Sequence, residues 1–146
     1  MDAIDKAIIA ELERDGRLTN VELALRVGLT TGPCLRRVQR LETDGVILGY
    51  RAVIDPASVD RSFEVLIDLS LQSQDAETVE HFEEELARAA EVLELRRLFG
   101  NPDYFVRVAV ADLPAYETFL SRRVMTIPGI KNVTSHFTMK TLKPGP

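Results

Sequence analysis

The chain has 146 residues, of which 45% are hydrophobic and 28% charged, and its formal net charge is −5. These values are typical of a globular protein with one ordinary domain or two small ones. No run approaches the ~20 apolar residues that span a bilayer, and the first residues lack the basic and apolar blocks of a signal peptide, so we expect a cytoplasmic protein without a membrane partner. The single cysteine, Cys34, excludes an intrachain disulfide and argues against a structural zinc cluster.

The first predicted helix opens with Asp2 and Asp5 and ends near Asp15 and Gly16. Ile9 widens an apolar stripe whose main members lie four residues apart, namely Ile4, Ile8 and Leu12. A helix of this length is not stable alone. We therefore expect it to pack on the two helices that follow, which makes a three-helix unit.

A helix-turn-helix is predicted over residues 19–45. Thr19 and Glu22 have the spacing of a capping box, and Gly28 can adopt the left-handed conformation that ends a helix. Thr30 is then placed to cap the second helix. The expected buried faces consist of Val21, Ala24 and Leu25 on the first helix, and of Cys34, Leu35, Val38 and Leu41 on the second.

The remaining face of the second helix is basic, because it carries three arginines and no acid before Glu42. Guanidinium groups pair with phosphates and with the acceptor edge of guanine, and a recognition helix presents its N-terminal half to the major groove. The alternative is an ordinary solvated helix face. We predict binding to double-stranded DNA, and the expected contact residues are Thr30, Thr31, Arg36, Arg37, Gln39 and Arg40.

The charge is divided unevenly along the chain. Residues 1–54 hold eight basic and eight acidic residues, whereas residues 55–146 hold ten basic and fifteen acidic residues. The whole excess of −5 therefore falls in the second part. Because exposed charges beyond ~10 Å are largely screened at moderate salt, a basic helix can bind DNA on an acidic protein.

The segment Val46–Ile54 is rich in β-branched and aromatic residues, which predicts a strand that leaves the DNA-binding unit and ends at Asp55-Pro56. In a monomer this strand would have open edges and exposed apolar side chains, so we expect it to pair with another chain. The alternative is a wing packed on its own domain.

The second half predicts four strands and two helices in the order βαββαβ. This order is typical of an α+β, ferredoxin-like fold, with both helices on one face of an antiparallel sheet and the other face free for a partner. Asp75 and Asp112 are placed to cap the helices, the first of which extends to about Ala90. The expected strands cover 63–71, 92–99, 104–110 and 130–139.

The sequence gives little support for an enzyme or a metal site. His81 and His136 are the only histidines, and neither has a second histidine or cysteine at ligand spacing. No phosphate-binding glycine loop and no nucleophile elbow occurs. We therefore expect no catalytic residues, no metal and no cofactor. A small ferredoxin-like enzyme and an effector-binding, oligomerising protein without operator-specific DNA binding remain the alternatives.

The chain resembles the leucine-responsive regulatory protein/AsnC (Lrp/AsnC) family of transcription regulators over essentially its whole length. The stretches that carry the resemblance are LERDGRLTNVELALRVGLT and CLRRVQRLETDGVILGYRAVIDP. One departure is Thr31-Gly32-Pro33, where the family usually has serine-rich polar residues. The resemblance implies a helix-turn-helix (winged-helix-like) domain at 1–45, a hinge strand at 46–62 that crosses to a dimer mate, and a ferredoxin-like (RAM) domain at 63–146 that senses an amino acid. It also implies a homodimer that assembles to an octamer.

The resemblance also implies an effector site at the turn between the second and third strands. FGNPDYFVR aligns with a family stretch of glycine, two variable residues, aspartate and an aromatic residue. Backbone amides near Gly100 could bind a ligand carboxylate, and Asp103 could hold an ammonium group. The alternative is that Asp103 only satisfies turn amides. The expected effector-binding residues are Gly100, Asn101, Asp103, Tyr104 and Ser135.

Overall fold

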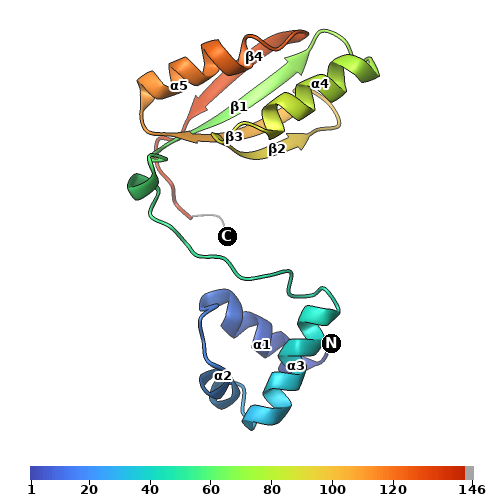
Figure 1. Ribbon diagram of the computed structural model, residues 1–146, viewed down its shortest axis with the longest axis vertical. Coiled ribbons are helices and arrows are strands. Elements are labelled where there is room, and N and C mark those ends of the chain that lie inside the picture. The colour runs from blue at the N-terminus through green and yellow to red at the C-terminus, as the bar shows by residue number, and fades with distance from the viewer. Residues whose placement is uncertain (144–146) are drawn as a thin grey trace. The chain divides into compact units, whose positions relative to one another are not determined.

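The computed structural model describes residues 1–143, so the end of the predicted C-terminal domain, 144–146, lies outside the described residues. The chain divides into two compact units, Met1–Val53 and Ile54–Pro146. Figure 1 shows the helices and strands of both units. Within the described part of the chain, no helix is both long and apolar enough to cross a bilayer.

The first unit consists of three helices: α1 (Ala3–Arg14), α2 (Asn20–Arg26) and α3 (Thr31–Thr43). The predicted capping box begins α2 at Thr19, and a second one, between Asp2 and Asp5, begins α1. Gly28 has a φ of 71° in the turn between α2 and α3, which confirms the expected left-handed position. Thr30 is the N-cap of α3, although its side chain makes no capping hydrogen bond.

The core of the first unit confirms most of the predicted stripes and corrects two of them. Ile8, Cys34 and Leu41 are buried together with residues of α2. On α2, however, Leu23 and Ala24 are the buried residues, whereas Leu25 is 76% exposed. Two further residues that were expected in the core are also exposed, namely Val21 and Leu35.

The predicted strand over Val46–Ile54 is not formed within this chain. Ile47 packs on the core of the first unit, and the Tyr50 hydroxyl donates a hydrogen bond to Glu42. Beyond these contacts the segment is irregular, and Leu48 and Val53 are 94% and 98% exposed. A strand needs a hydrogen-bonding neighbour, and none of the described residues pairs with this segment. The segment is therefore neither a paired strand nor a packed wing in the single chain.

The second unit has the predicted βαββαβ order. Its strands form one antiparallel sheet in the order β2-β3-β1-β4, with α4 and α5 over the same face (Figure 1). Short helical segments precede β1 (η1, Pro56–Val59) and follow α5 (η2, Leu120–Val124). The main elements are β1 (Phe63–Leu71), α4 (Ala76–Ala87), β2 (Val92–Arg97), β3 (Tyr104–Val110), α5 (Leu113–Phe119) and β4 (Ile130–Phe137).

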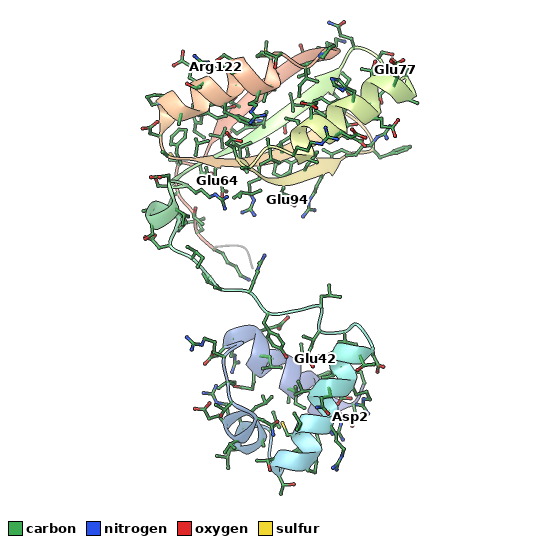
Figure 2. All side chains as sticks on the ribbon, viewed as in Figure 1. Asp2, Glu42, Glu64, Glu77, Glu94 and Arg122 are labelled. Carbon is green, nitrogen blue, oxygen red and sulfur yellow. The ribbon has the colours of Figure 1, made fainter. Side chains whose placement is uncertain are left out.

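The two faces of the sheet differ in polarity. Val65, Ile67 and Leu69 of β1 are fully buried under the helices together with Phe82 of α4. The alternate residues of β1 lie on the other face and are only half-buried. Figure 2 shows Glu64 and Glu94 on this second face, away from the helices. The strict alternation of β1 thus follows from one covered and one uncovered face.

Candidate nucleic-acid interface and ligand pocket

The exposed face of α3 is presented by the packing of its apolar side on α1 and α2. Thr31 and Gln39 are exposed on α3, and Arg36 and Arg40 lie beside them at a spacing of four residues. The Asn20 side chain donates a hydrogen bond of 2.8 Å to the Thr31 carbonyl, so α2 is tied directly to the first turn of α3. This contact joins residues of two different helices, so no local sequence pattern predicts it.

Two of the three predicted DNA-binding arginines are bound by carboxylates of α1. Arg37 Nη1 lies 2.8 Å from Asp2 Oδ2 and 2.7 Å from Asp5 Oδ1, and Arg40 Nη2 lies 2.8 Å from Asp5 Oδ2. Asp5 is 1% exposed, so its charge is compensated inside the unit. The prediction that these arginines simply point outward is therefore wrong for Arg37, whose side chain is only 25% exposed. Figure 2 labels Asp2 beside α3.

The same network keeps both carboxylates ionised. The backbone amide of Asp5 and the Arg37 guanidinium lower the pKa of Asp2 to about 2. The backbone amide of Asp2 and then Arg37 lower the pKa of Asp5. In return, Asp2 and Asp5 raise the pKa of Arg37. At neutral pH the cluster is fully charged, and it attaches α3 to α1.

Arg36 differs from the other two arginines of α3. It is exposed, and it forms no ion pair with any of residues 1–143. Arg40 is intermediate, because its side chain is 53% exposed although one nitrogen binds Asp5. Five residues at the start and along the outer face of α3 are thus open to a phosphate or a base edge, although Arg40 also binds Asp5. They are Thr30, Thr31, Arg36, Gln39 and Arg40.

The turn between β2 and β3 is closed by Asp103. The Leu98 amide donates to the Asp103 carbonyl at 2.7 Å, and the Leu71 amide donates to Asp103 Oδ2 at 2.8 Å. The Asn101–Pro102 peptide is cis, and Gly100 has a φ of 134° that favours glycine. Asp103 therefore satisfies a backbone amide, as the alternative interpretation expected, but the amide belongs to the end of β1 and not to the turn itself.

A polar cavity of about 240 Å³ lies beside this turn, on the sheet face away from the helices. Asp68 and Ser70 of β1 are paired with residues of β4, and Ser70 Oγ lies 3.3 Å from Asn101 Oδ1. The lining residues are Asp68, Ser70, Asn101, Pro102, Asn132 and Thr134. Nearly all of them offer a hydroxyl, an amide or a carboxylate, so the cavity suits a small polar molecule.

Two predicted effector-binding residues lie on the opposite face of the sheet. Tyr104 is 1% exposed in the core, where its hydroxyl donates to Glu83 Oε1 at 2.7 Å, and burial raises its pKa. Ser135 Oγ lies 2.6 Å from the Tyr116 hydroxyl under α5. Because side chains alternate along a strand, Asn132 and Thr134 of β4 lie on the other face, where they line the cavity. This alternation was the signal by which Asn132 and Thr134 could have been found.

The chain matches known proteins over both units. Residues 1–47 match the family described as winged helix-turn-helix DNA-binding, and residues 64–146 match the family described as the Lrp/AsnC ligand binding domain. The leucine-responsive regulatory protein of Escherichia coli K12 is 36% identical over 143 residues, which are 98% of this chain and 87% of that protein.

Two solved structures are similar across nearly the whole chain. A transcriptional regulator from Neisseria meningitidis, solved as a complex with L-Met, has a TM-score of 0.93 and 33% identity, covering 99% of this chain and 93% of that one. An AsnC family regulator from Agrobacterium tumefaciens has a TM-score of 0.91 and 38% identity, covering 99% of this chain and 94% of that one.

These matches, together with α3 and the cavity beside the β2–β3 turn, define a DNA-binding transcription regulator with a ligand-binding domain. The chain belongs to the Lrp/AsnC family. Its relatives are transcription regulators and not enzymes.

Proposed function

We propose that this regulator acts in the cytoplasm and contacts operator DNA chiefly through Thr31, Arg36 and Gln39, with Arg40 shared between DNA and Asp5. The observation that carries this proposal is the freedom of Arg36 on a helix whose other arginines are engaged. An exposed guanidinium without a carboxylate partner is available to a phosphate or to guanine. Arg37 then holds α3 in place and contributes to DNA binding only indirectly.

The proposed effector is an α-amino acid bound in the 240 Å³ cavity. The Asp68 carboxylate offers a partner for an ammonium group, and the hydroxyls and amides of Ser70, Asn101, Asn132 and Thr134 offer donors for a carboxylate. His136 Nε2 already lies 3.0 Å from Asp68 Oδ2, so a ligand ammonium group would compete with it. The N. meningitidis relative that was solved with L-Met supports an amino acid as the chemical class.

The proposed assembly is a homodimer that associates further to an octamer. Two surfaces of the single chain support pairing: the half-buried sheet face around Leu66, and the exposed apolar segment that contains Leu48 and Val53. Sedimentation should give a mass above that of the monomer at micromolar concentration. Leu66→Asp, which places a charge on this sheet face, should lower the assembly state.

An effector that contacts no DNA can change DNA affinity only through its differential affinity for two arrangements of the protein. Reciprocity then requires DNA to change effector affinity by the same factor. The experiment is a thermal-shift screen of the twenty amino acids, followed by DNA titrations with and without the best ligand.

Variants on β4 locate the effector site. Asn132→Ala should abolish the ligand response and leave ligand-free DNA affinity near that of the wild type. Ser135→Ala is the matched control on the same strand, because its side chain points to α5 and not into the cavity. A full ligand response in Asn132→Ala would place the effector site elsewhere. Loss of the response in Ser135→Ala alone would also contradict the assignment.

A further inference from the structure

A second and larger cavity, of about 520 Å³, lies in the same unit where β3 ends and α5 begins. It shares no lining residue with the cavity beside the β2–β3 turn. Four segments contribute to its wall: residues 59–61 at the end of η1, residues 90–91 before β2, residues 109–111 at the end of β3, and one side of α5 and η2. Its volume falls within the range of ~300–1,000 Å³ that small-molecule sites occupy.

The wall of this cavity carries an excess of positive charge. Three arginines, Arg61, Arg122 and Arg123, face two acids, Asp60 and Glu91. Arg61 Nη2 lies 3.5 Å from the Ala90 carbonyl, a long contact that leaves its remaining donors available. Within residues 1–143, none of the three arginines forms an ion pair with a carboxylate. This contrasts with Arg37 and Arg88, which are both paired.

Two consecutive arginines of the cavity wall lie in the helical segment that follows α5. Leu120–Val124 forms a π-helical turn directly after α5. Such π-helical turns are rare overall but frequent at functional sites. Here both Arg122 and Arg123 line the cavity.

The rest of the cavity wall consists mainly of small side chains and includes one hydrogen-bond acceptor without a partner among residues 1–143. Small side chains leave the cavity open, namely those of Ala90, Ala109, Ala111 and Ala115. Glu91 Oε2 is inaccessible to solvent and has no hydrogen-bond partner among residues 1–143. Buried polar atoms almost always have a partner. Because the oxygen is covered as it stands, a donor on a molecule in the cavity would reach it only after the Glu91 side chain turns towards the cavity that it lines.

From this combination we infer a second ligand site that binds a small organic molecule with two acidic groups and one hydrogen-bond donor. The guanidinium groups of Arg61, Arg122 and Arg123 would bind the acidic groups, whether carboxylate or phosphate, and Glu91 would accept the donor. The net charge of the wall, three positive against two negative groups, favours an anion. This site goes beyond the proposed effector function and does not depend on it.

The test is calorimetric titration of the full-length protein with L-malate, succinate and inorganic phosphate. L-malate has two carboxylates and a hydroxyl donor, so it should bind more tightly than succinate, which lacks the donor. Comparable binding of phosphate at the same site would show that the anionic group there can be a phosphate, and would support the shared chemistry. No saturable binding of any probe at millimolar concentration would overturn the inference.

Variants separate this site from general anion binding. Arg122→Gln combined with Arg123→Gln should weaken L-malate binding by about tenfold or more, because charge-assisted hydrogen bonds are lost. Arg88→Gln is the control, since Arg88 lies exposed on the end of α4 and binds Glu84 and Glu85 outside the cavity. Ala115→Leu fills the cavity without a change of charge and should also abolish binding. Equal binding in the control and in both cavity variants, all with wild-type melting profiles, would refute the site.

Discussion

The three arginines of α3 should have different roles, and single alanine substitutions separate them. Arg36 is exposed and free among the described residues, whereas Arg37 binds the carboxylates of Asp2 and Asp5 at 2.8 and 2.7 Å. We expect Arg36→Ala to weaken DNA binding without a change in thermal stability. Arg37→Ala should instead lower the melting temperature, because it leaves the buried Asp5 with one charged partner fewer.

The expected magnitude for Arg36→Ala depends on what the guanidinium contacts. If it contacts a phosphate, the slope of log K against log salt should fall by ~0.9 for each chain on the DNA, and therefore by ~1.8 for a dimer. All sequences would then be weakened alike. If it reads a base, the loss should be ~1–3 kcal/mol, which is about 5- to 150-fold in affinity, at one position of the site.

The assay is fluorescence anisotropy at several salt concentrations, with two duplexes. One duplex is of mixed sequence, and the other is selected by the wild-type protein from a random pool. Melting curves of the same samples report on the stability of each variant. DNA binding that is unchanged in Arg36→Ala but lost in Arg37→Ala at full stability would refute the assignment of Arg36 as the free DNA contact.

Four further substitutions test the fold. Gly129→Ala should lower the free energy of unfolding of the second unit by about 2–4 kcal/mol, because φ is +89° and the new Cβ would lie 2.5 Å from Thr78 Cγ2. Gly28 has a φ of +71° but open space around it, so Gly28→Ala should lower the free energy of unfolding by only about 1–2 kcal/mol in chemical denaturation. Phe82 is fully buried, so Phe82→Ala should lower the free energy of unfolding by about 3–5 kcal/mol in the same measurement. The Ser73 hydroxyl and then the Thr78 amide lower the pKa of Asp75 to about 2 from a usual value of 3.8, so its stabilising effect is complete above pH ~4 and is lost as the pH falls towards 2. Asp75→Asn should therefore show a smaller drop in melting temperature between pH 5 and pH 3 than the wild type, and an equal drop would exclude this carboxylate as a source of acid sensitivity.

The features that the sequence predicted well are those that short-range chemistry determines. The bounds of β1 and β3 agree with the prediction, because strict alternation defines the first and the turn at residues 100–103 begins the second. The caps at Thr19, Asp75 and Asp112 were also predicted correctly, since a cap and its partner lie within a few residues.

The errors arise where the answer depends on residues far away in the chain. The buried face of α2 was assigned to the wrong residues because a helix of seven residues has too few turns to define one face, and packing on α1 and α3 decides it. The ion pair between Arg37 and Asp5 could not be predicted from a local pattern, because the two residues are 32 positions apart in the sequence. The role of Ser135 in effector binding stays a prediction from the resemblance, and its side chain lies against Tyr116 on the helix-covered face of the sheet.

The ion pairs between α1 and α3 divide the recognition helix into fixed and exchangeable positions. Replacing Arg37 would leave Arg40 as the one cation bound to the buried Asp5. The side chains of Thr31, Arg36 and Gln39 are exposed and contact no other helix through a hydrogen bond or an ion pair within residues 1–143. A protein with this division could be redirected to a different DNA sequence by substitutions at the exchangeable positions alone. A grafted helix that replaces position 37 as well would need a basic residue that binds Asp2 and Asp5. Without one, the packing of the grafted helix on α1 would be weakened.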